Sequence, residues 1–277
     1  LAATLLALMA REGIASAQPE RWLGAGGTPT TDEEFQGEVR LSPSQFERAL
    51  ACPLRWFLTT IGADGPSNAA ASLGTLVHAL AEENPHGSAQ ELTEALEARI
   101  EELGYNLDTW AGRHSERRAH AIVDNLASYI VGVPGRVDVE QMVEAQVEGV
   151  TIRGRMDRME HVDEGVRVTD LKTGKSGYSA KTVPDNPQLA AYQMALLATG
   201  QKVAGARIAL LGDKKPKTFD QKPLEGETLE EWRGKVREVA AIARGPYFQA
   251  TPSEDACRYC SFDRLCPARE RGRKVVE

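Results

Sequence analysis

The pattern of apolar and polar positions predicts a helical first half and a second half that mixes strands and helices. Ser42 and Pro43 form a helix start, with serine as the N-cap and proline in the first turn. Further helices are expected at 73–84, 88–103 and 109–131, a strand meander at 137–172, a helix at 187–199, a strand at 203–211 and a last helix at 227–244. This order predicts an α/β fold with a mixed central sheet flanked by helices, in which the strand at 203–211 joins the sheet through a crossover.

The first forty residues differ in composition from the rest of the chain. The opening LAATLLALMA is apolar and predicts a helix, and residues 15–38 are rich in the small and polar residues of a linker. Because the chain begins with Leu1 rather than methionine, we expect 1–40 to be a helix and linker that follow an upstream region, and 41–277 to form one domain. No apolar run reaches the roughly 18 residues of a membrane span, so no membrane association is expected.

A hairpin in the middle of the chain carries two carboxylates. Strands are expected at 147–159 and 165–171, with Asp157 near the end of the first and Asp170 and Lys172 on one face at the end of the second. Carboxylate oxygens are the ligands that Mg²⁺ and Mn²⁺ prefer, and a lysine beside them can orient a water or stabilise developing negative charge. A surface hairpin with solvated charges is the alternative for so short a pattern.

Other polar residues could join these carboxylates. His78 lies on an apolar helix and is either a packed core residue or a metal ligand. Gln188 and Tyr192 stand at i and i+4 on one face of the helix that follows the hairpin. Glu144, on the strand before the hairpin, is a further carboxylate that could face the same site.

Four cysteines join the two ends of the chain. Cys257, Cys260 and Cys266 form a C-x2-C-x5-C run, and Cys52 lies far upstream. Four thiolates are the ligand set of a [4Fe–4S] cluster or of tetrahedral zinc, and the spacing alone does not separate the two. Two disulfides are the less favoured alternative, because no secretory signal precedes them.

The formal net charge of −7 argues against a general DNA-coating protein but not against an enzyme whose basic patches are local. The candidate patches are Arg153, Arg155 and Arg158; Lys172, Lys175 and Lys181; Lys214, Lys215 and Lys217; and Arg269, Arg271, Arg273 and Lys274. Each of them could equally be a solvated charged face.

Seven motifs taken in order resemble the RecB-type nucleases of the PD-(D/E)xK superfamily. They are LSPSQFERALACPLRWF from Leu41, GTLVH from Gly74, Glu144, GRMDR from Gly154, DLKTG from Asp170, QLAAY from Gln188, and the terminal CRYCSFDRLCP. The cysteine pattern is similar to the iron–sulfur subset of that family, which includes the nuclease modules of Adn- and AddB-type helicase–nucleases. Each motif is weak alone, but their shared order is specific.

The resemblance implies a restriction-endonuclease-like fold and a metal-dependent deoxyribonuclease. It implies that His78, Asp157, Asp170 and the backbone carbonyl of Leu171 hold Mg²⁺ or Mn²⁺ and that Lys172 is the catalytic lysine. The supporting residues of the site would be Glu144, Gln188 and Tyr192. The DNA-binding residues would be Arg155, Arg158, Lys175, Gln188 and Tyr192. A [4Fe–4S] cluster would be held by Cys52, Cys257, Cys260 and Cys266.

The resemblance also implies the setting of the activity. A helicase domain in the same chain and a second helicase–nuclease subunit would deliver single-stranded DNA in the bacterial cytoplasm, during the resection of double-strand breaks. One alternative is a catalytically silent DNA-binding module held together by the cluster. Another is a zinc-bound interaction domain without nuclease activity, which would require the motif order to be coincidental.

Overall fold

The computed structural model describes residues 2–18, 33–64, 73–175, 177–258 and 260–269. It divides into two compact units. One comprises Leu1–Gln36 with Arg244–Tyr247, and it contains α1 (Ala2–Arg11) and the short helix η1 (Ala15–Ala17). The other comprises Gly37–Ala243 with Phe248–Glu277 and contains every other element described below. Most of the expected linker and the basic tail from residue 270 lie outside the described residues.

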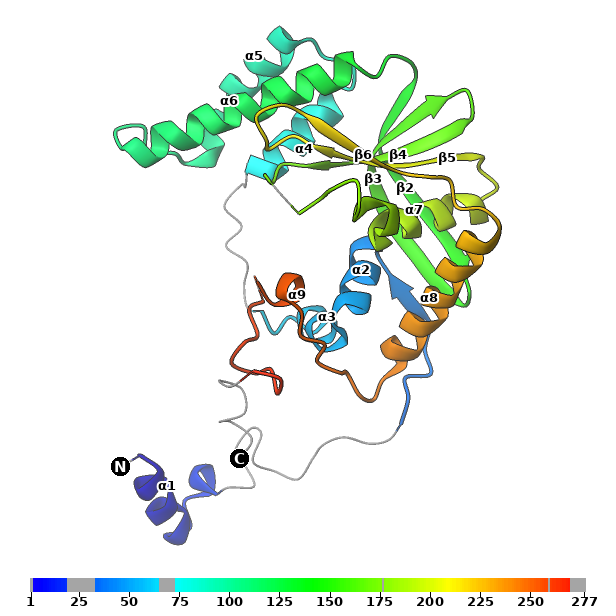
Figure 1. Ribbon diagram of the computed structural model, residues 1–277. Coiled ribbons are helices and arrows are strands. Elements are labelled where there is room, and N and C mark those ends of the chain that lie inside the picture. The colour runs from blue at the N-terminus through cyan, green and yellow to red at the C-terminus, as the bar shows by residue number, and fades with distance from the viewer. Residues whose placement is uncertain (1, 19–32, 65–72, 176, 259, 270–277) are drawn as a thin grey trace. The chain divides into compact units, whose positions relative to one another are not determined.

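The larger unit is built on a mixed β-sheet (Figure 1). Its strands are β1 (Val39–Leu41), β2 (Val137–Val147), β3 (Val150–Val162), β4 (Gly165–Lys172), β5 (Val203–Leu210) and β6 (Lys217–Gln221). The order is β1-β3-β4-β5-β6, with β2 paired to β3. The pairs β1–β3 and β4–β5 are parallel and the others are antiparallel. The expected α/β fold with a mixed sheet is therefore confirmed.

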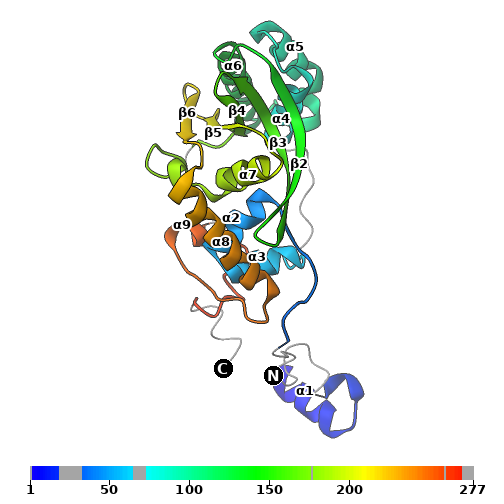
Figure 2. The same cartoon turned by 90° about the vertical axis from the view of Figure 1, so that its right-hand side faces the viewer.

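Helices cover the two faces of this sheet (Figures 1 and 2). On one face lie α4 (Leu73–Glu83), α5 (Ala89–Arg99) and α6 (Trp110–Val131), with the short η3 (Ile100–Leu103) after α5. On the other lie α2 (Pro43–Ala51), α7 (Pro187–Ala198) and α8 (Gly226–Arg244), with α3 (Pro53–Thr60), η4 (Val183–Asp185) and α9 (Glu254–Arg258) on the same side. Each face buries its own apolar cluster, because successive residues of a strand point to opposite faces: Ile208 joins the α2–α7–α8 cluster and Ala209 joins the α4–α6 cluster. No helix of the described residues is long and apolar enough to span a membrane.

The chain departs from the expected elements at its turns. Val147 ends β2 rather than opening the next strand, since Glu148 and Gly149 form a two-residue turn with φ angles of 49° and 77°. Two positive φ angles are the geometry of a tight hairpin turn, but Glu-Gly lacks the usual Asn-Gly or Asp-Gly signal. The extended backbone of Cys52 separates α2 from α3, because Pro53 disfavours a helical residue before it.

Gly154 is required where two helices press against β3. A Cβ at this position would lie 2.6 Å from Pro43 Cδ and 3.0 Å from Tyr192 Cε1. These contacts bring the start of α2 and the middle of α7 close to the strand that carries Asp157.

We expect Gly154→Ala to lower the free energy of unfolding by about 1–3 kcal/mol, because the added methyl overpacks this contact. Urea denaturation measures the change. Gly234→Ala is the matched control, since Gly234 lies within α8 and its Cβ would have no neighbour nearer than 3.8 Å. That variant should gain up to about 1 kcal/mol from helix propensity. Equal stability of Gly154→Ala and the unmodified protein would contradict the close packing.

Candidate active site

Asp157 and Asp170 lie where β3 and β4 separate. The antiparallel ladder between these strands runs from Val162↔Gly165 to Arg158↔Thr169 and stops there. The next register positions, which would face each other, are Asp157 and Asp170. Beyond this point β4 continues to pair with β5, while the Asp157 carboxylate accepts a hydrogen bond of 2.7 Å from the Leu171 N–H. The two predicted carboxylates are thus held side by side at the mouth of a gap between strands.

Lys172 and Gln188 both bind Asp170. The lysine Nζ lies 2.8 Å from Asp170 Oδ2, and Gln188 Nε2 donates a hydrogen bond of 2.7 Å to Oδ1. Lys172 also donates to Gln188 Oε1 at 3.2 Å, which closes a triangle of three side chains. Gln188 is positioned by the start of α7, where Asn186 caps the helix by accepting a hydrogen bond from the Leu189 N–H.

Burial dominates the electrostatics of Asp170. Its side chain is 7 % exposed, and burial raises its pKa to about 6, with the Asp157 charge adding to the rise and Lys172 opposing it. Burial also opposes the charge of Lys172, but Asp170, Tyr178 and Glu47 together outweigh it and raise the lysine pKa. The lysine is therefore a fixed positive charge at neutral pH.

A second group of ligands surrounds Asp157. His78 Nδ1 lies 3.2 Å from Asp157 Oδ1, and one ligand atom each of His78, Glu140 and Asp157 falls within 4.8 Å of the others. The hydrogen bond with Asp157 raises the pKa of His78, with burial opposing it. His78 thus faces the carboxylates rather than the apolar core.

The residues present fit a hard divalent cation. Two or three carboxylates and one imidazole are donors that Mg²⁺ and Mn²⁺ accept. Asp170 Oδ2 is buried and makes no hydrogen bond, because Lys172 approaches it outside hydrogen-bond geometry. This oxygen has the Lys172 ion pair but no hydrogen bond, so it keeps a lone pair for a cation. Leu171, whose carbonyl was expected to join the set, lies at the same strand end.

Glu144 does not reach this group, and Glu140 does. Glu144 faces Arg153 across the hairpin and forms an exposed ion pair with it at 3.3 Å. Glu140 lies four residues before Glu144 in β2, about 13 Å from it along the strand and further from the turn. The pairs on either side of it, Val139↔Arg158 and Gln141↔Met156, set Glu140 opposite Asp157. Glu140 was not predicted from the sequence, because the position of the hairpin turn that sets this register was not predicted either.

Glu140 has a strained backbone. Its φ is 51°, a left-handed conformation that non-glycine residues adopt rarely and often at functional sites. Burial raises the pKa of its carboxyl, with Arg155 opposing this, and Arg155 Nε lies 2.5 Å from Glu140 Oε2. The strained residue therefore turns its carboxylate into the site.

The predicted DNA-binding arginines differ from each other. Arg155 is largely exposed at the rim of the site, and its carbonyl accepts a 2.7 Å hydrogen bond from the Tyr192 hydroxyl. Arg158 is fully buried beside Glu160 and donates to the Pro85 carbonyl, so the expectation that it contacts DNA is wrong. Its guanidinium lies 6.0 Å from the Tyr129 ring of α6, on the side of the sheet that α4 and α6 cover.

The four cysteines are half-buried and form no disulfide. Helix α3, which follows Cys52, contacts the C-terminal segment: Arg55 donates to the Ala256 carbonyl at 2.8 Å, and Phe57 stacks on Phe248 at 4.0 Å. Ala256 directly precedes Cys257. The fold thus brings the helix that follows Cys52 to the segment that leads into the C-terminal cysteine run.

Known proteins similar to this chain were found by sequence and by structure. The chain is 26% identical over 270 residues to the Gene 69 protein of Mycobacterium phage D29, covering 82% of this chain and 96% of that protein. Two crystal structures are similar at low identity. One is SSO0001, at 16% identity and a TM-score of 0.41, covering 85% of this chain and 89% of the other. The second is a protein from Eubacterium rectale proposed to be an exonuclease, at 15% identity and a TM-score of 0.47, covering 84% and 94%.

The family comparison spans most of the chain. The PD-(D/E)XK nuclease superfamily matches residues 40–267, a range that contains every residue of the site described above. This protein belongs to the PD-(D/E)XK nuclease superfamily.

Proposed function

We propose that this protein is a Mg²⁺- or Mn²⁺-dependent nuclease that hydrolyses phosphodiester bonds of single-stranded DNA. The observation that carries the proposal is the pair Asp157 and Asp170 at the separation of two strands, with Lys172 bound to the second carboxylate. A catalytically silent DNA-binding module would not need this costly arrangement, because a buried carboxylate beside another raises the energy of the fold.

The chain's own residues have distinct tasks in this mechanism. His78, Glu140, Asp157 and Asp170 would hold the metal, which supplies Lewis-acid activation of water and neutralises charge on the scissile phosphate. Lys172, charged at neutral pH, orients the attacking water or stabilises the leaving oxygen. Gln188 fixes the direction of both Asp170 and Lys172, and Tyr192 fixes the backbone beside Asp157.

We further propose that Cys52, Cys257, Cys260 and Cys266 hold a [4Fe–4S] cluster. The cluster would fasten α3 to the C-terminal segment, adding to the hydrogen bond and the ring stacking that already join them. The same proposal places the nuclease beside a helicase domain and a second helicase–nuclease subunit in the bacterial cytoplasm, where unwound single strands arise during the resection of broken DNA. These features rest on the resemblance of the motifs.

Asp170→Asn should abolish metal-dependent cleavage of labelled single-stranded DNA while DNA binding persists, because the amide is a poor metal ligand but keeps the shape of the side chain. Gel assays with Mn²⁺ and with EDTA measure cleavage. Asp220→Asn is the control, since this carboxylate pairs with Arg207 on the exposed edge of the sheet. Cleavage by Asp170→Asn at the rate of the unmodified protein would remove the assigned site. A wild-type protein that binds DNA but never cuts it would favour the silent module.

Glu140→Gln and Glu144→Gln form a matched pair on one strand. The first should raise the Mn²⁺ concentration for half-maximal cleavage by about tenfold, which is the lower end of the cost of losing a partner at a metal site. The second should leave it unchanged, because Glu144 is exposed and paired with Arg153. Titration of Mn²⁺ against the cleavage rate compares them. A larger increase in the required Mn²⁺ concentration for Glu144→Gln than for Glu140→Gln would mean that Glu144, and not Glu140, supports the metal.

Protein purified without oxygen should be brown and contain about four irons per chain if the cluster is [4Fe–4S]. Stoichiometric zinc without iron would show that the four cysteines hold a tetrahedral zinc ion instead of the cluster. Cys52→Ser should lose the metal and lower the thermal midpoint, because α3 is then no longer tied to the C-terminal run. Full metal content in Cys52→Ser would exclude Cys52 as a ligand.

A further inference from the structure

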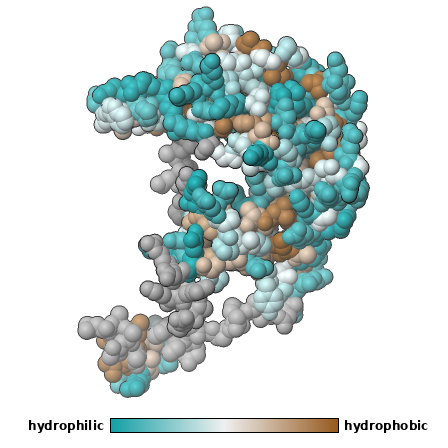
Figure 3. Space-filling model, viewed as in Figure 1, coloured by the Kyte–Doolittle hydropathy of each residue, from teal (hydrophilic) through white to brown (hydrophobic). Residues whose placement is uncertain are grey.

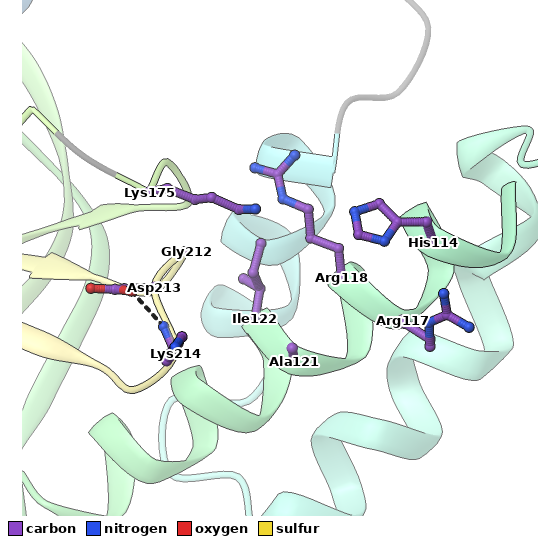
Figure 4. Close-up of a pocket in the computed structure, with 9 residues that line it drawn as sticks. All are labelled: His114, Arg117, Arg118, Ala121, Ile122, Lys175, Gly212, Asp213 and Lys214. Atoms are coloured by element: carbon purple, nitrogen blue, oxygen red, sulfur yellow. Dashed lines mark hydrogen bonds between the residues drawn. The ribbon is translucent and has the colours of Figure 1, made fainter. Parts of the chain in front are cut away.

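A basic cleft opens beside the catalytic lysine, between α6 and two loops. Its volume is about 390 Å³. One wall is α6, which presents His114, Arg117 and Arg118, and the other wall is formed by the loops that carry Lys175 and Lys214 (Figure 4). In that view, Lys175 and Arg118 extend toward each other from opposite walls.

The cations of the cleft are available for a ligand. Arg117, Lys175 and Lys214 are exposed, and within the described ranges none of them takes part in an ion pair or a side-chain hydrogen bond. The acid in the lining, Asp213, is paired with Lys217 and also accepts a hydrogen bond from the Lys214 N–H. Arginines elsewhere on the surface, such as Arg40, Arg136 and Arg237, are by contrast paired with carboxylates.

The cleft is fixed relative to the active site. The Leu211 N–H donates to the Lys172 carbonyl at 2.8 Å, and Arg118 reaches the Thr173 carbonyl at 3.5 Å. The buried Asn125 of α6 donates to the carbonyls of Leu211 and Asp213, both at 2.8 Å. The chain therefore runs from the catalytic lysine directly into the cleft wall.

The two loops of that wall also touch each other closely. A Cβ at Gly212 would lie 2.1 Å from the Gly174 carbonyl oxygen, so only glycine allows this approach. Lys175 follows Gly174 and Lys214 lies two residues after Gly212, so this backbone contact sets how far apart the two lysines begin.

An aromatic pair continues the cleft along α6. Trp110 is 70 % exposed and stacks on His114, with ring centroids 5.3 Å apart and planes within 7°. Trp110, His114, Arg117 and Ala121 recur at three- and four-residue intervals and so share one face, which extends about 16 Å along the helix axis. This part of α6 projects beyond the sheet, and its surface is mostly hydrophilic (Figures 1 and 3).

We propose that this face of α6, with Lys175 and Lys214, is the track along which the single strand approaches or leaves the cut site. Phosphates lie against Arg117, Lys175 and Lys214, and a base stacks on Trp110. Free cations interleaved with an exposed aromatic are the chemistry that binds single strands without sequence preference. The inference rests on the proposed nuclease function, from which its tests are separable.

Binding of fluorescein-labelled oligo(dT) to the full chain in EDTA tests the phosphate contacts without cleavage. Arg117→Gln/Lys214→Gln should weaken binding and reduce the slope of log affinity against log salt by about 1.4, or about 0.7 for each phosphate that is no longer neutralised. Oligo(dA) should show the same weakening, since phosphates are common to both strands. The control Lys202→Gln/Lys222→Gln removes the same charge at the opposite end of β5 and β6 and should leave the slope unchanged. Equal slopes for the cleft variant and the unmodified protein would overturn the inference.

Trp110→Ala separates base stacking from charge. It should weaken binding of oligo(dT) by about tenfold, as removal of one stacked base does, and leave binding of an abasic deoxyribose-phosphate strand unchanged. Equal weakening of binding for both strands, or no change for either, would show that no base stacks on Trp110.

A small phosphodiester distinguishes this inference from the nuclease itself. Thymidine 5′-p-nitrophenyl phosphate reaches only the metal site, so Arg117→Gln/Lys214→Gln should hydrolyse it with Mn²⁺ at the unmodified rate. Absence of hydrolysis in the unmodified protein would contradict the proposed function. The slopes of log affinity against log salt would still test whether the single strand binds along α6. A lower rate on the small substrate in the variant would mean that these cations act at the metal site and not along a track.

Discussion

The burial of Asp170 next to Asp157 is the constraint on which the rest of the site depends. Two carboxylates in a poorly solvated place repel each other and lose hydration, which costs several kcal/mol unless positive charge or hydrogen bonds compensate. Without metal, Lys172 and Gln188 compensate for Asp170, while His78 and the Leu171 N–H compensate for Asp157. The Asp170 oxygen that faces Lys172 makes no hydrogen bond besides this ion pair, so a divalent cation could add to the compensation there.

This constraint explains contacts that lie outside the site. Gln188 can reach Asp170 because α7 begins at Pro187, where Asn186 caps the helix and also donates to the Glu47 carboxylate of α2 at 3.1 Å. Burial raises the pKa of Glu47, and Lys172 opposes this shift. A chain of polar contacts thus runs from α2 through the start of α7 to β4. Gly154 permits it, because a larger residue there would push α2 and α7 away from the strand.

The sequence predicts much of this arrangement because it depends on short-range patterns. Helical periodicity locates α4 and α6, and alternation along β4 sets Asp170 and Lys172 on one face, as the structure has them. The features that the sequence did not predict depend on strand register and on long-range packing. Glu140 faces Asp157 only because the Glu148-Gly149 turn fixes the pairing of β2 with β3. The face of Arg158 could not be assigned without knowing that α4 and α6 cover it. The short edge strands β1 and β6 were not expected, because three to five residues carry too little periodicity.

The distribution of charge has a consequence for how substrate reaches the site. A net charge of −7 repels DNA at long range, so the field of the whole molecule does not steer a strand to the acidic centre. Attraction must come from local cations that lie within about 8–10 Å of the phosphates, the distance over which charges act at physiological salt. Arg117, Lys175 and Lys214 are such cations beside Lys172, on α6 and the two loops, where they offset the carboxylates that the metal requires. Under the proposed function, such a molecule would bind loose DNA weakly and would depend on a strand being placed in the cleft, as an attached helicase would do. Under the proposed function, the net negative charge would disfavour the binding of loose DNA, and the basic cleft would accept a strand that has been delivered.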